Sequence, residues 1–314
     1  MSHTDASPSM RHLAALVAVT LLLSCSVTPV ADEGDGKTLY GLDDRVELRE
    51  ASQPLRNAGA SVVALFGSDA LIPVADGRWR LRFGPSGAER GWCPDERFSR
   101  QPRGALCSGF LIAPDRIATS AHCVRPPDDP YAAGLDCDEA RFVFGFGLGA
   151  DGEPPAVLTP EQVYRCAAVI DGEGSPNGAD WRVVRLDRAV SDRLPLPVYA
   201  GDTPLARGTA LTVIGHPIGL PAKVAPGGAV TDDTTVDHFV ADLDTYEGNS
   251  GSPVLATLAA RPVVVGLLAR GETDFDATPE GCERSRRCDA ERCGGEHVTR
   301  STRFASWASA TVRP

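Results

Sequence analysis

One serine lies in a turn that would suit a nucleophile. Ser250 stands in the string Glu247-Gly-Asn-Ser-Gly-Ser-Pro253, with one glycine two residues before it and another directly after it. Glycine permits a sharp backbone turn that aims two N–H groups, those of Gly248 and Ser250, at one point. Such a point is an oxyanion hole, which stabilises the negative charge on a carbonyl oxygen under attack. The same turn is also a common loop, so the chemistry depends on a base for the serine.

A histidine in the first half of the chain is the candidate base. His122 follows an apolar run at residues 108–113 and a turn. A histidine accepts a serine proton near neutral pH, which is the role that this nucleophile requires. The neighbouring Cys123 comes sixteen residues after Cys107, and a disulfide between these two cysteines would pin the histidine loop against the strand before it.

A carboxylate completes this set, because it fixes the tautomer of the histidine and stabilises the imidazolium. Asp180 is the preferred candidate, since it stands directly before the apolar run 181–186. Asp171, in a Gly-rich loop, is the reserve, and Asp187 lies at the far end of the run. Together with the serine and the histidine, the carboxylate predicts hydrolysis through an acyl intermediate, which needs no cofactor.

The elements that must position these residues are short strands. Eight apolar runs are separated by turns, for which 32 Gly and 25 Pro provide the residues. The runs span residues 61–66, 108–113, 141–146, 181–186, 209–216, 238–243, 252–257 and 262–269. The pattern predicts an all-β barrel or sandwich. The last segment, residues 301–310, has Phe304, Trp307 and Ala308 at helical spacing and predicts a closing helix.

The strings TSAHC, DWRVVRL and GNSGSP, in this order, resemble the trypsin/chymotrypsin family of serine peptidases. The resemblance spans most of residues 42–312, and the start GLDDRV is similar to the bacterial glutamyl-endopeptidase-like branch. It implies two six-stranded antiparallel β-barrels, the first over residues 42–195 with the histidine and the aspartate, the second over 196–314 with the serine and the closing helix. It also implies polypeptide substrates, and it assigns the oxyanion hole to Gly248 and Ser250.

One residue of the serine turn departs from the family pattern. Asn249 stands where trypsin-like enzymes usually carry an acid, which in animal members pairs with the new N-terminal amine after zymogen cleavage. We therefore expect the site to form without that ion pair.

The resemblance also indicates which residues contact the substrate side chain. Asp244, six residues before Ser250, falls at the base of the primary specificity pocket, where a carboxylate selects Arg or Lys. Thr245 is an alternative lining residue, and Arg270, the only nearby cation, could instead neutralise Asp244, which would weaken a basic preference. We expect a basic rather than an acidic preference, because no histidine stands on the strand where acid-selecting relatives carry one.

The N-terminus has the layout of a secretory signal. The eleven-residue apolar run 13–23 follows Arg11 and His12 and is too short to span a membrane. It ends in Leu-Leu-Ser-Cys25, which resembles a bacterial lipoprotein box, and the alternative is cleavage a few residues later to a secreted protein. We expect a signal peptide over 1–24, a tether or propeptide over 25–41, and localisation in the cell envelope through lipidated Cys25 or outside the cell.

The cysteine count and the net charge limit how the cysteines are used and which partners the protein could bind. Nine cysteines leave eight when Cys25 is set aside, an even set suited to disulfides in an oxidising compartment. The six cysteines other than Cys107 and Cys123 are divided three and three between the two halves of the chain. Because three is an odd number, at least one disulfide must join the two halves if all six pair. Zinc bound by Cys282, Cys288, Cys293 and His297 is the weaker alternative. A formal charge of −11 argues against a nucleic-acid partner, and we expect a monomer.

The sequence leaves one competing function of a different class open. A protein with this fold could bind polypeptides without cleaving them, although such proteins usually lose a member of the catalytic set and none is lost here. A stress-protease relative is less suitable, because such proteins usually add a peptide-binding module and are poor in cysteine.

Overall fold

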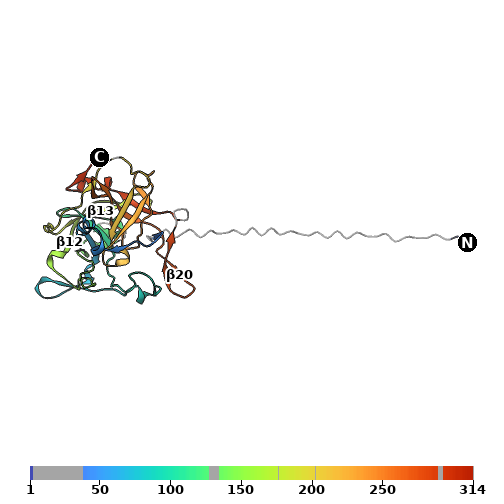
Figure 1. Cartoon of the computed structure of the whole chain (residues 1–314), viewed down its shortest axis with the longest axis horizontal. Coiled ribbons are helices and arrows are strands. Elements are labelled where there is room, and N and C mark those ends of the chain that lie inside the picture. Colours follow the sequence, from blue (N-terminus) through green and yellow to red (C-terminus); the bar gives the residue numbers. More distant parts are fainter. Residues whose placement is uncertain (3–37, 127–133, 176, 202, 289–292, 314) are drawn as a thin grey trace. The chain divides into compact units, whose positions relative to one another are not determined.

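The computed structural model describes residues 1–2, 38–126, 134–175, 177–201, 203–288 and 293–313. The apolar run 13–23, Cys25 and nearly all of the expected tether lie outside the described residues. The folded part belongs to one compact unit, Glu33–Pro314, and consists mainly of strands (Figure 1). Two closed antiparallel barrels of six strands confirm the expected fold class.

The first barrel closes in the order β10-β12-β13-β7-β6-β3. Its strands are β3 (Val62–Gly67), β6 (Cys107–Ala113), β7 (Arg116–Thr119), β10 (Ala140–Phe144), β12 (Val163–Gly174) and β13 (Asp180–Leu186). Side chains that point inward from several strands, among them Leu65, Leu111, Phe142 and Val184, are fully buried and fill the barrel. A barrel of this size leaves an interior that side chains fill completely.

The second barrel runs β18-β15-β16-β17-β23-β19 and closes where β18 pairs with β19. Its strands are β15 (Ala210–Gly215), β16 (Lys223–Asp232), β17 (His238–Ala241), β18 (Pro253–Leu258), β19 (Arg261–Arg270) and β23 (Glu296–Arg300). A separate cluster that includes Val213, Phe239, Leu268 and Val298 fills this barrel. Each barrel therefore has its own core.

A further apolar cluster joins the two barrels. It combines Phe110 and Trp181 of the first barrel with Ile214 and Leu267 of the second, and Phe304 of the C-terminal segment packs among them. The Phe304 ring meets the Phe110 ring edge-on, with centroids 5.9 Å apart. This shared core fixes how the two barrels face each other, and hence how residues from both meet.

Shorter elements surround the barrels. They comprise β1 (Leu39–Tyr40), β2 (Val46–Glu47), α1 (Gln53–Gly59), β4 (Leu71–Pro73), β5 (Trp79–Leu81), β8 (Val124–Arg125), β9 (Leu135–Asp136), β11 (Val157–Leu158), β14 (Val198–Tyr199), β20 (Phe275–Ala277), β21 (Glu283–Ser285), β22 (Arg287–Cys288) and β24 (Thr311–Val312). Although the N-terminal segment precedes the first barrel in sequence, β2 pairs with β16 of the second barrel and β1 pairs with β22.

The closing helix expected over residues 301–310 does not form as one α-helix. The segment makes two 3-10 turns, Ser301–Arg303 and Ala305–Trp307, separated by Phe304 with φ −125° and ψ 0°. Burial of the Phe304 ring between the barrels requires this break. The chain then becomes extended, because β24 pairs with β14.

Four disulfides account for eight cysteines. They join Cys93 to Cys282, Cys107 to Cys123, Cys137 to Cys166 and Cys288 to Cys293. The pairing of Cys107 with Cys123 agrees with the prediction, and one bridge crosses between the halves of the chain. The zinc alternative is wrong for this structure, because its three cysteines are in disulfides and the His297 ring stacks on His238 instead. Four disulfides are compatible with an exported protein.

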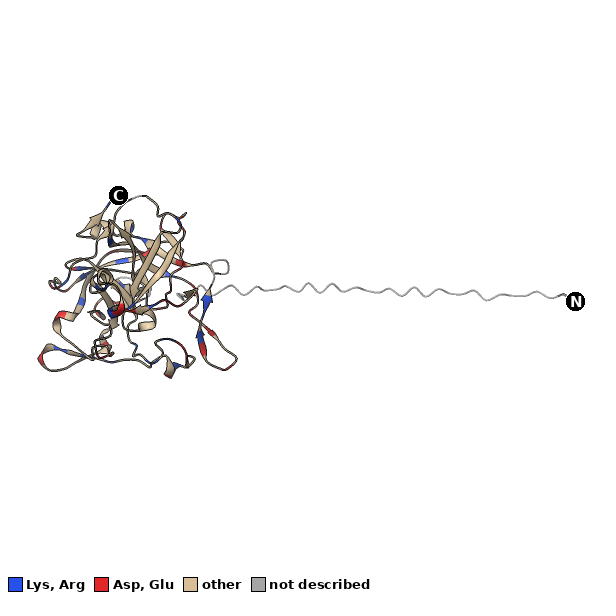
Figure 2. Cartoon of the chain, in the orientation of Figure 1, with Lys and Arg blue, Asp and Glu red and all other residues tan. Residues whose placement is uncertain are grey.

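Charged residues of both signs are distributed over the fold (Figure 2). The hairpin of β20 and β21 illustrates this mixture, because Arg286 pairs with Asp276 and Arg284 pairs with Asp95. Within the described residues, no helix has the length and apolar character needed to cross a membrane.

Candidate active site

The histidine and the carboxylate singled out from the sequence are in contact. His122 Nδ1 lies 2.6 Å from Asp180 Oδ2. The other carboxylate oxygen accepts hydrogen bonds from the backbone N–H groups of Ala121, at 2.7 Å, and of His122, at 3.3 Å. The carboxylate thus holds both the imidazole and the short turn that carries it.

The pairing of two strands creates this contact. In the antiparallel pair of β13 and β7, Arg182 lies opposite Thr119. Asp180, two residues before Arg182, therefore lies beside the turn Ala121–Cys123 that follows β7. The backbone of Asp180 is fixed from the second barrel, because its N–H donates to Thr299 Oγ1 at 3.1 Å and the Thr299 hydroxyl donates to its carbonyl, also at 3.1 Å.

The environment keeps the Asp180 carboxylate charged. Burial by itself raises the pKa of Asp180, but hydrogen bonds from His122 and from two backbone N–H groups outweigh burial and lower the pKa below its ordinary value. An ionised carboxylate at Nδ1 keeps the proton on that nitrogen and leaves Nε2 as the acceptor.

Ser250 lies against the same histidine turn, between the barrels. Its carbonyl accepts a hydrogen bond from the backbone N–H of Ser108, at 2.8 Å, and lies 3.7 Å from the sulfur of Cys123. Ser250 itself is buried. The Cys107–Cys123 disulfide therefore ties β6, the histidine turn and the serine turn into one structure.

Two glycines of the serine turn adopt backbone angles that favour glycine. Gly248 has φ +87° and Gly251 has φ +83°. A Cβ atom at Gly251 would lie 2.2 Å from the Ser108 carbonyl oxygen and 2.4 Å from Thr119 Oγ1. The turn therefore fits against the first barrel only with glycine at this position.

The two other carboxylates weighed from the sequence lie elsewhere. Asp171 accepts a hydrogen bond from the indole of Trp307, at 2.9 Å. Asp187 pairs with Arg165 and Arg188 at the far end of β13. Of the three candidates, Asp180 is the one in contact with His122.

The expected pocket carboxylate is engaged with the N-terminal segment. Asp244 accepts hydrogen bonds from the backbone N–H groups of Tyr40, at 2.7 Å, and Asp44, at 3.4 Å. Burial raises the pKa of Asp244 to about 6, although the positive charge of Arg45 opposes this rise. The alternative in which Arg270 neutralises Asp244 is not supported, because the Arg270 guanidinium donates to the Ser175 and Gly178 carbonyls, just before Asp180.

Thr245 contacts an acidic residue that no pattern in the sequence indicated. Its hydroxyl donates to Glu296 Oε2 at 2.6 Å, and Glu296 is fully buried at the start of β23. The carboxylate lies against Gly271, which directly follows β19, since a Cβ there would lie 2.3 Å from it. No motif surrounds Glu296 or Thr299, so only the barrel pairing reveals them.

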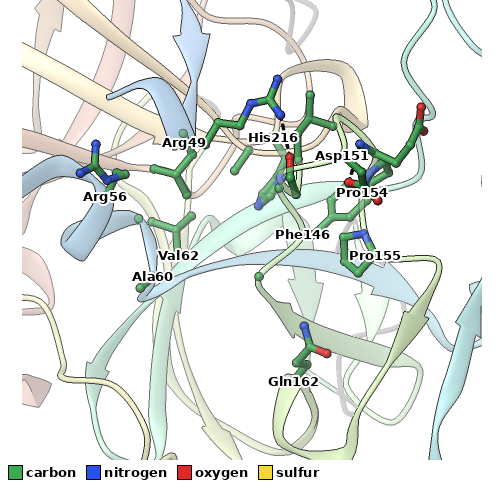
Figure 3. A pocket seen from close by; sticks show the side chains of 18 of the residues that line it. Arg49, Arg56, Ala60, Val62, Phe146, Asp151, Pro154, Pro155, Gln162 and His216 are labelled. Carbon is green, nitrogen blue, oxygen red and sulfur yellow. Dashed lines mark hydrogen bonds between the residues drawn. The ribbon is translucent and has the colours of Figure 1, made fainter. Parts of the chain in front are cut away.

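His216 lies in the turn that follows β15, and its side chain points away from His122, Asp180 and Ser250 into a separate cavity. It lines a cavity of about 690 Å³ that contains none of His122, Asp180 and Ser250, and its ring stacks on Phe146 (Figure 3). Its Nδ1–H donates to the Leu220 carbonyl at 3.0 Å. Burial lowers the pKa of His216 to about 3, so the ring is neutral at physiological pH.

Two closed antiparallel barrels, with a histidine and an aspartate from one and a serine from the other, define the trypsin-like class of folds. The family model of the trypsin-like peptidase domain matches residues 107–267, just over half of the chain. The chain belongs to this family and is therefore a peptidase of the trypsin family. The matched residues include His122, Asp180 and Ser250.

Proposed function

We propose that the protein is a serine endopeptidase that hydrolyses peptide bonds through an acyl-enzyme on Ser250. The observation that carries this proposal is the 2.6 Å contact between His122 Nδ1 and the buried, ionised Asp180. In this arrangement His122 Nε2 accepts the proton of Ser250 while the serine oxygen attacks the peptide carbonyl. The imidazolium then gives the proton to the leaving amine, and water releases the acyl group by the same route.

The N–H groups of Gly248 and Ser250 are the proposed oxyanion hole. Negative charge develops on the carbonyl oxygen as the serine attacks, and two backbone donors stabilise it without adding a titratable group. Loss of one such donor lowers kcat about 100- to 1000-fold in other peptidases. The mechanism uses side chains and backbone of this chain alone and needs no cofactor.

Covalent labelling tests the proposal against the catalytically silent alternative. A fluorophosphonate reacts with an activated serine, so we expect stoichiometric labelling of the wild-type protein and none of Ser250→Ala. Circular dichroism would establish that both proteins are folded. A folded wild type that stays unlabelled would refute the peptidase and favour a protein that only binds polypeptides.

For the substrate, we propose a basic residue before the cleaved bond. Asp244 directly precedes Thr245, and Glu296 accepts a hydrogen bond from the Thr245 hydroxyl, so two buried carboxylates neighbour this residue. An acidic environment favours a cationic side chain. Cleavage of a peptide library would give the profile directly. Selection of glutamate instead would contradict this proposal and would support the similarity of residues 41–46 to glutamyl endopeptidases.

Export as a monomeric lipoprotein is proposed from the N-terminal sequence. If Cys25 carries the lipid, the mature chain starts there and partitions into detergent. Mass spectrometry of the purified protein would distinguish this product from a soluble one cut after Cys25.

A further inference from the structure

The backbone between Glu247 and Ser250, here called the oxyanion turn, is fixed by its carbonyls. The Glu247 carbonyl accepts a hydrogen bond from the N–H of Ile218, and the Gly248 carbonyl accepts one from the hydroxyl of Ser108, at 2.8 Å. The Asn249 carbonyl accepts one from the N–H of Ser252, at 2.8 Å. Three successive peptide planes are therefore held.

Those bonds determine where the proposed oxyanion donors point. In a trans peptide the N–H is directed opposite to the C=O of the same plane. The Gly248 N–H shares its plane with the Glu247 carbonyl, so it is directed away from Ile218. For the same reason the Ser250 N–H is directed away from Ser252. A flip of either plane would replace a donor of the hole with a carbonyl oxygen.

Nothing charged at Asn249 can hold the turn. Its side-chain oxygen accepts a hydrogen bond from the Ser252 hydroxyl at 3.3 Å, and the side chain is buried. The space behind it is tight, since a Cβ at Gly215 would lie 2.6 Å from the Asn249 oxygen and 1.9 Å from Ser252 Oγ. The three carbonyls of the turn therefore accept hydrogen bonds from neutral donors, whereas the Glu247 N–H at its start donates to Asp274 Oδ2 at 2.9 Å.

Ser108 holds the middle one of these three peptide planes. Its side chain is fully buried in β6, and its oxygen accepts a hydrogen bond from the N–H of His216 at 3.0 Å while its proton goes to the Gly248 carbonyl. The accepted bond fixes the orientation of the hydroxyl. A bond between buried groups is worth more than an exposed one, because water cannot replace it.

Ile218 is held in a conformation that its side chain disfavours. Its φ is +53°, in the left-handed region that is rare and strained for a β-branched residue. Neighbouring contacts hold it there, since Arg103 Nε donates to its carbonyl at 2.6 Å and the guanidinium stacks over Trp92, 4.9 Å from the ring centroid. This conformation directs the Ile218 N–H at Glu247.

We propose that Ser108 and the strained turn at Ile218 form a clamp that keeps the oxyanion hole formed, with Arg103 supporting Ile218. Ser108 and Arg103 are then positioning residues of the peptidase. Ile218 fixes the peptide plane that carries the Gly248 N–H, and Ser108 fixes the next plane, which joins this plane to the one that carries the Ser250 N–H. Both residues act on the transition state through the orientation of the turn and do not touch the substrate. This inference rests on the proposed function.

Replacing Ser108 by alanine tests the clamp. The variant leaves the Gly248 carbonyl without its donor, and we expect kcat to fall about 10- to 100-fold, less than on complete loss of one donor of the hole, with KM changed less than about twofold. A peptide aldehyde of the substrate sequence forms a hemiacetal whose oxygen occupies the hole. Its inhibition constant should rise by the same factor as kcat falls.

A matched control separates positioning from stability. Ser61 is also buried, and its hydroxyl donates to the Leu194 carbonyl at 2.7 Å, a part-buried contact that involves no residue of the oxyanion turn. Ser61→Ala also removes a bond from a hydroxyl to a carbonyl, and it should lower the melting temperature by no more than Ser108→Ala does, because Leu194 is exposed. We expect its kcat and its aldehyde affinity to change less than about twofold.

The possible results distinguish the proposed clamp from the proposed peptidase activity. A folded Ser108→Ala protein whose kcat and aldehyde affinity match those of Ser61→Ala would overturn the clamp and leave the peptidase intact. An unlabelled wild type would overturn both. If Ser108→Ala does not fold, Arg103→Gln removes the bond to Ile218 instead, and we expect a loss of at least about threefold in kcat and in aldehyde affinity. An unchanged kcat in that variant would also refute the clamp.

Discussion

Asp244 makes the stability of this protein depend on pH in an unusual direction. The carboxylate is buried, and its pKa rises from the ordinary 3.8 to about 6. The folded state therefore holds a proton on Asp244 more tightly than the unfolded chain does. The stability that comes from this proton is complete below pH 3.8, and it is lost as the pH rises to 6 and beyond.

The substitution Asp244→Asn isolates this effect. An amide is neutral at every pH, and its oxygen can still accept the hydrogen bond from the Tyr40 N–H. A pKa rise of about two units corresponds to roughly 3 kcal/mol between the two ends of the titration. We expect the free energy of unfolding of the variant, relative to wild type, to increase by about 2–3 kcal/mol from pH 3.5 to pH 7.5.

Urea unfolding of both proteins, with disulfides intact, at several pH values between 3.5 and 8 would measure the difference. Other groups that titrate in this range affect both proteins equally, so the difference reports on residue 244. If the amide of the variant makes one hydrogen bond fewer than Asp244, the difference in unfolding free energy between the two proteins changes by the same amount at every pH. If the difference in unfolding free energy between the two proteins stays constant with pH, the pKa of Asp244 is not raised in the folded state and this explanation is refuted.

Three further substitutions test contacts described above or buried charged groups. Asp180→Asn keeps the shape of the site but loses the tautomer control of the histidine, so kcat should fall about 10,000-fold in a steady-state peptidase assay while the fold persists. Gly251→Ala should destabilise the fold by about 2–4 kcal/mol in urea because of its backbone clash, whereas Gly208→Ala, with φ +80° and open space, should cost about 1 kcal/mol. Glu47→Gln removes the carboxylate 3.0 Å from the buried ammonium of Lys223, whose pKa burial lowers to about 8. We expect a loss of about 3 kcal/mol at pH 6 that shrinks above pH 8, where the lysine is neutral; a loss independent of pH would contradict this assignment.

The residues of the expected chemistry were predictable because their types and their neighbours are specific. His122 beside a cysteine, Asp180 before an apolar strand and Ser250 between glycines each carry a local signal, and the structure brings the first two into contact. The strand content was equally visible, because Gly and Pro separate short apolar runs along the chain.

Other features depend on contacts between distant segments and leave no local signal. Asp244 accepts its hydrogen bond from Tyr40, 204 positions away, so its environment could not be predicted from its place before the serine. Ile218 adopts a backbone conformation opposite to its propensity. Ser108 stands in an otherwise apolar run, where a small polar residue usually has no special role. The closing segment had a helical pattern, but burial of Phe304 between the barrels decided its backbone.

The bridge between Cys93 and Cys282 has a consequence for a protein that digests others. The two sulfurs join positions 189 residues apart, and five of the six strands of each barrel lie between them. If one molecule nicks another in a surface loop of this stretch, both pieces stay covalently attached and keep their packing. A nicked molecule would run as one band on a gel without reductant and as two with it. Self-cleavage would then leave an active form of two disulfide-linked chains instead of separate fragments.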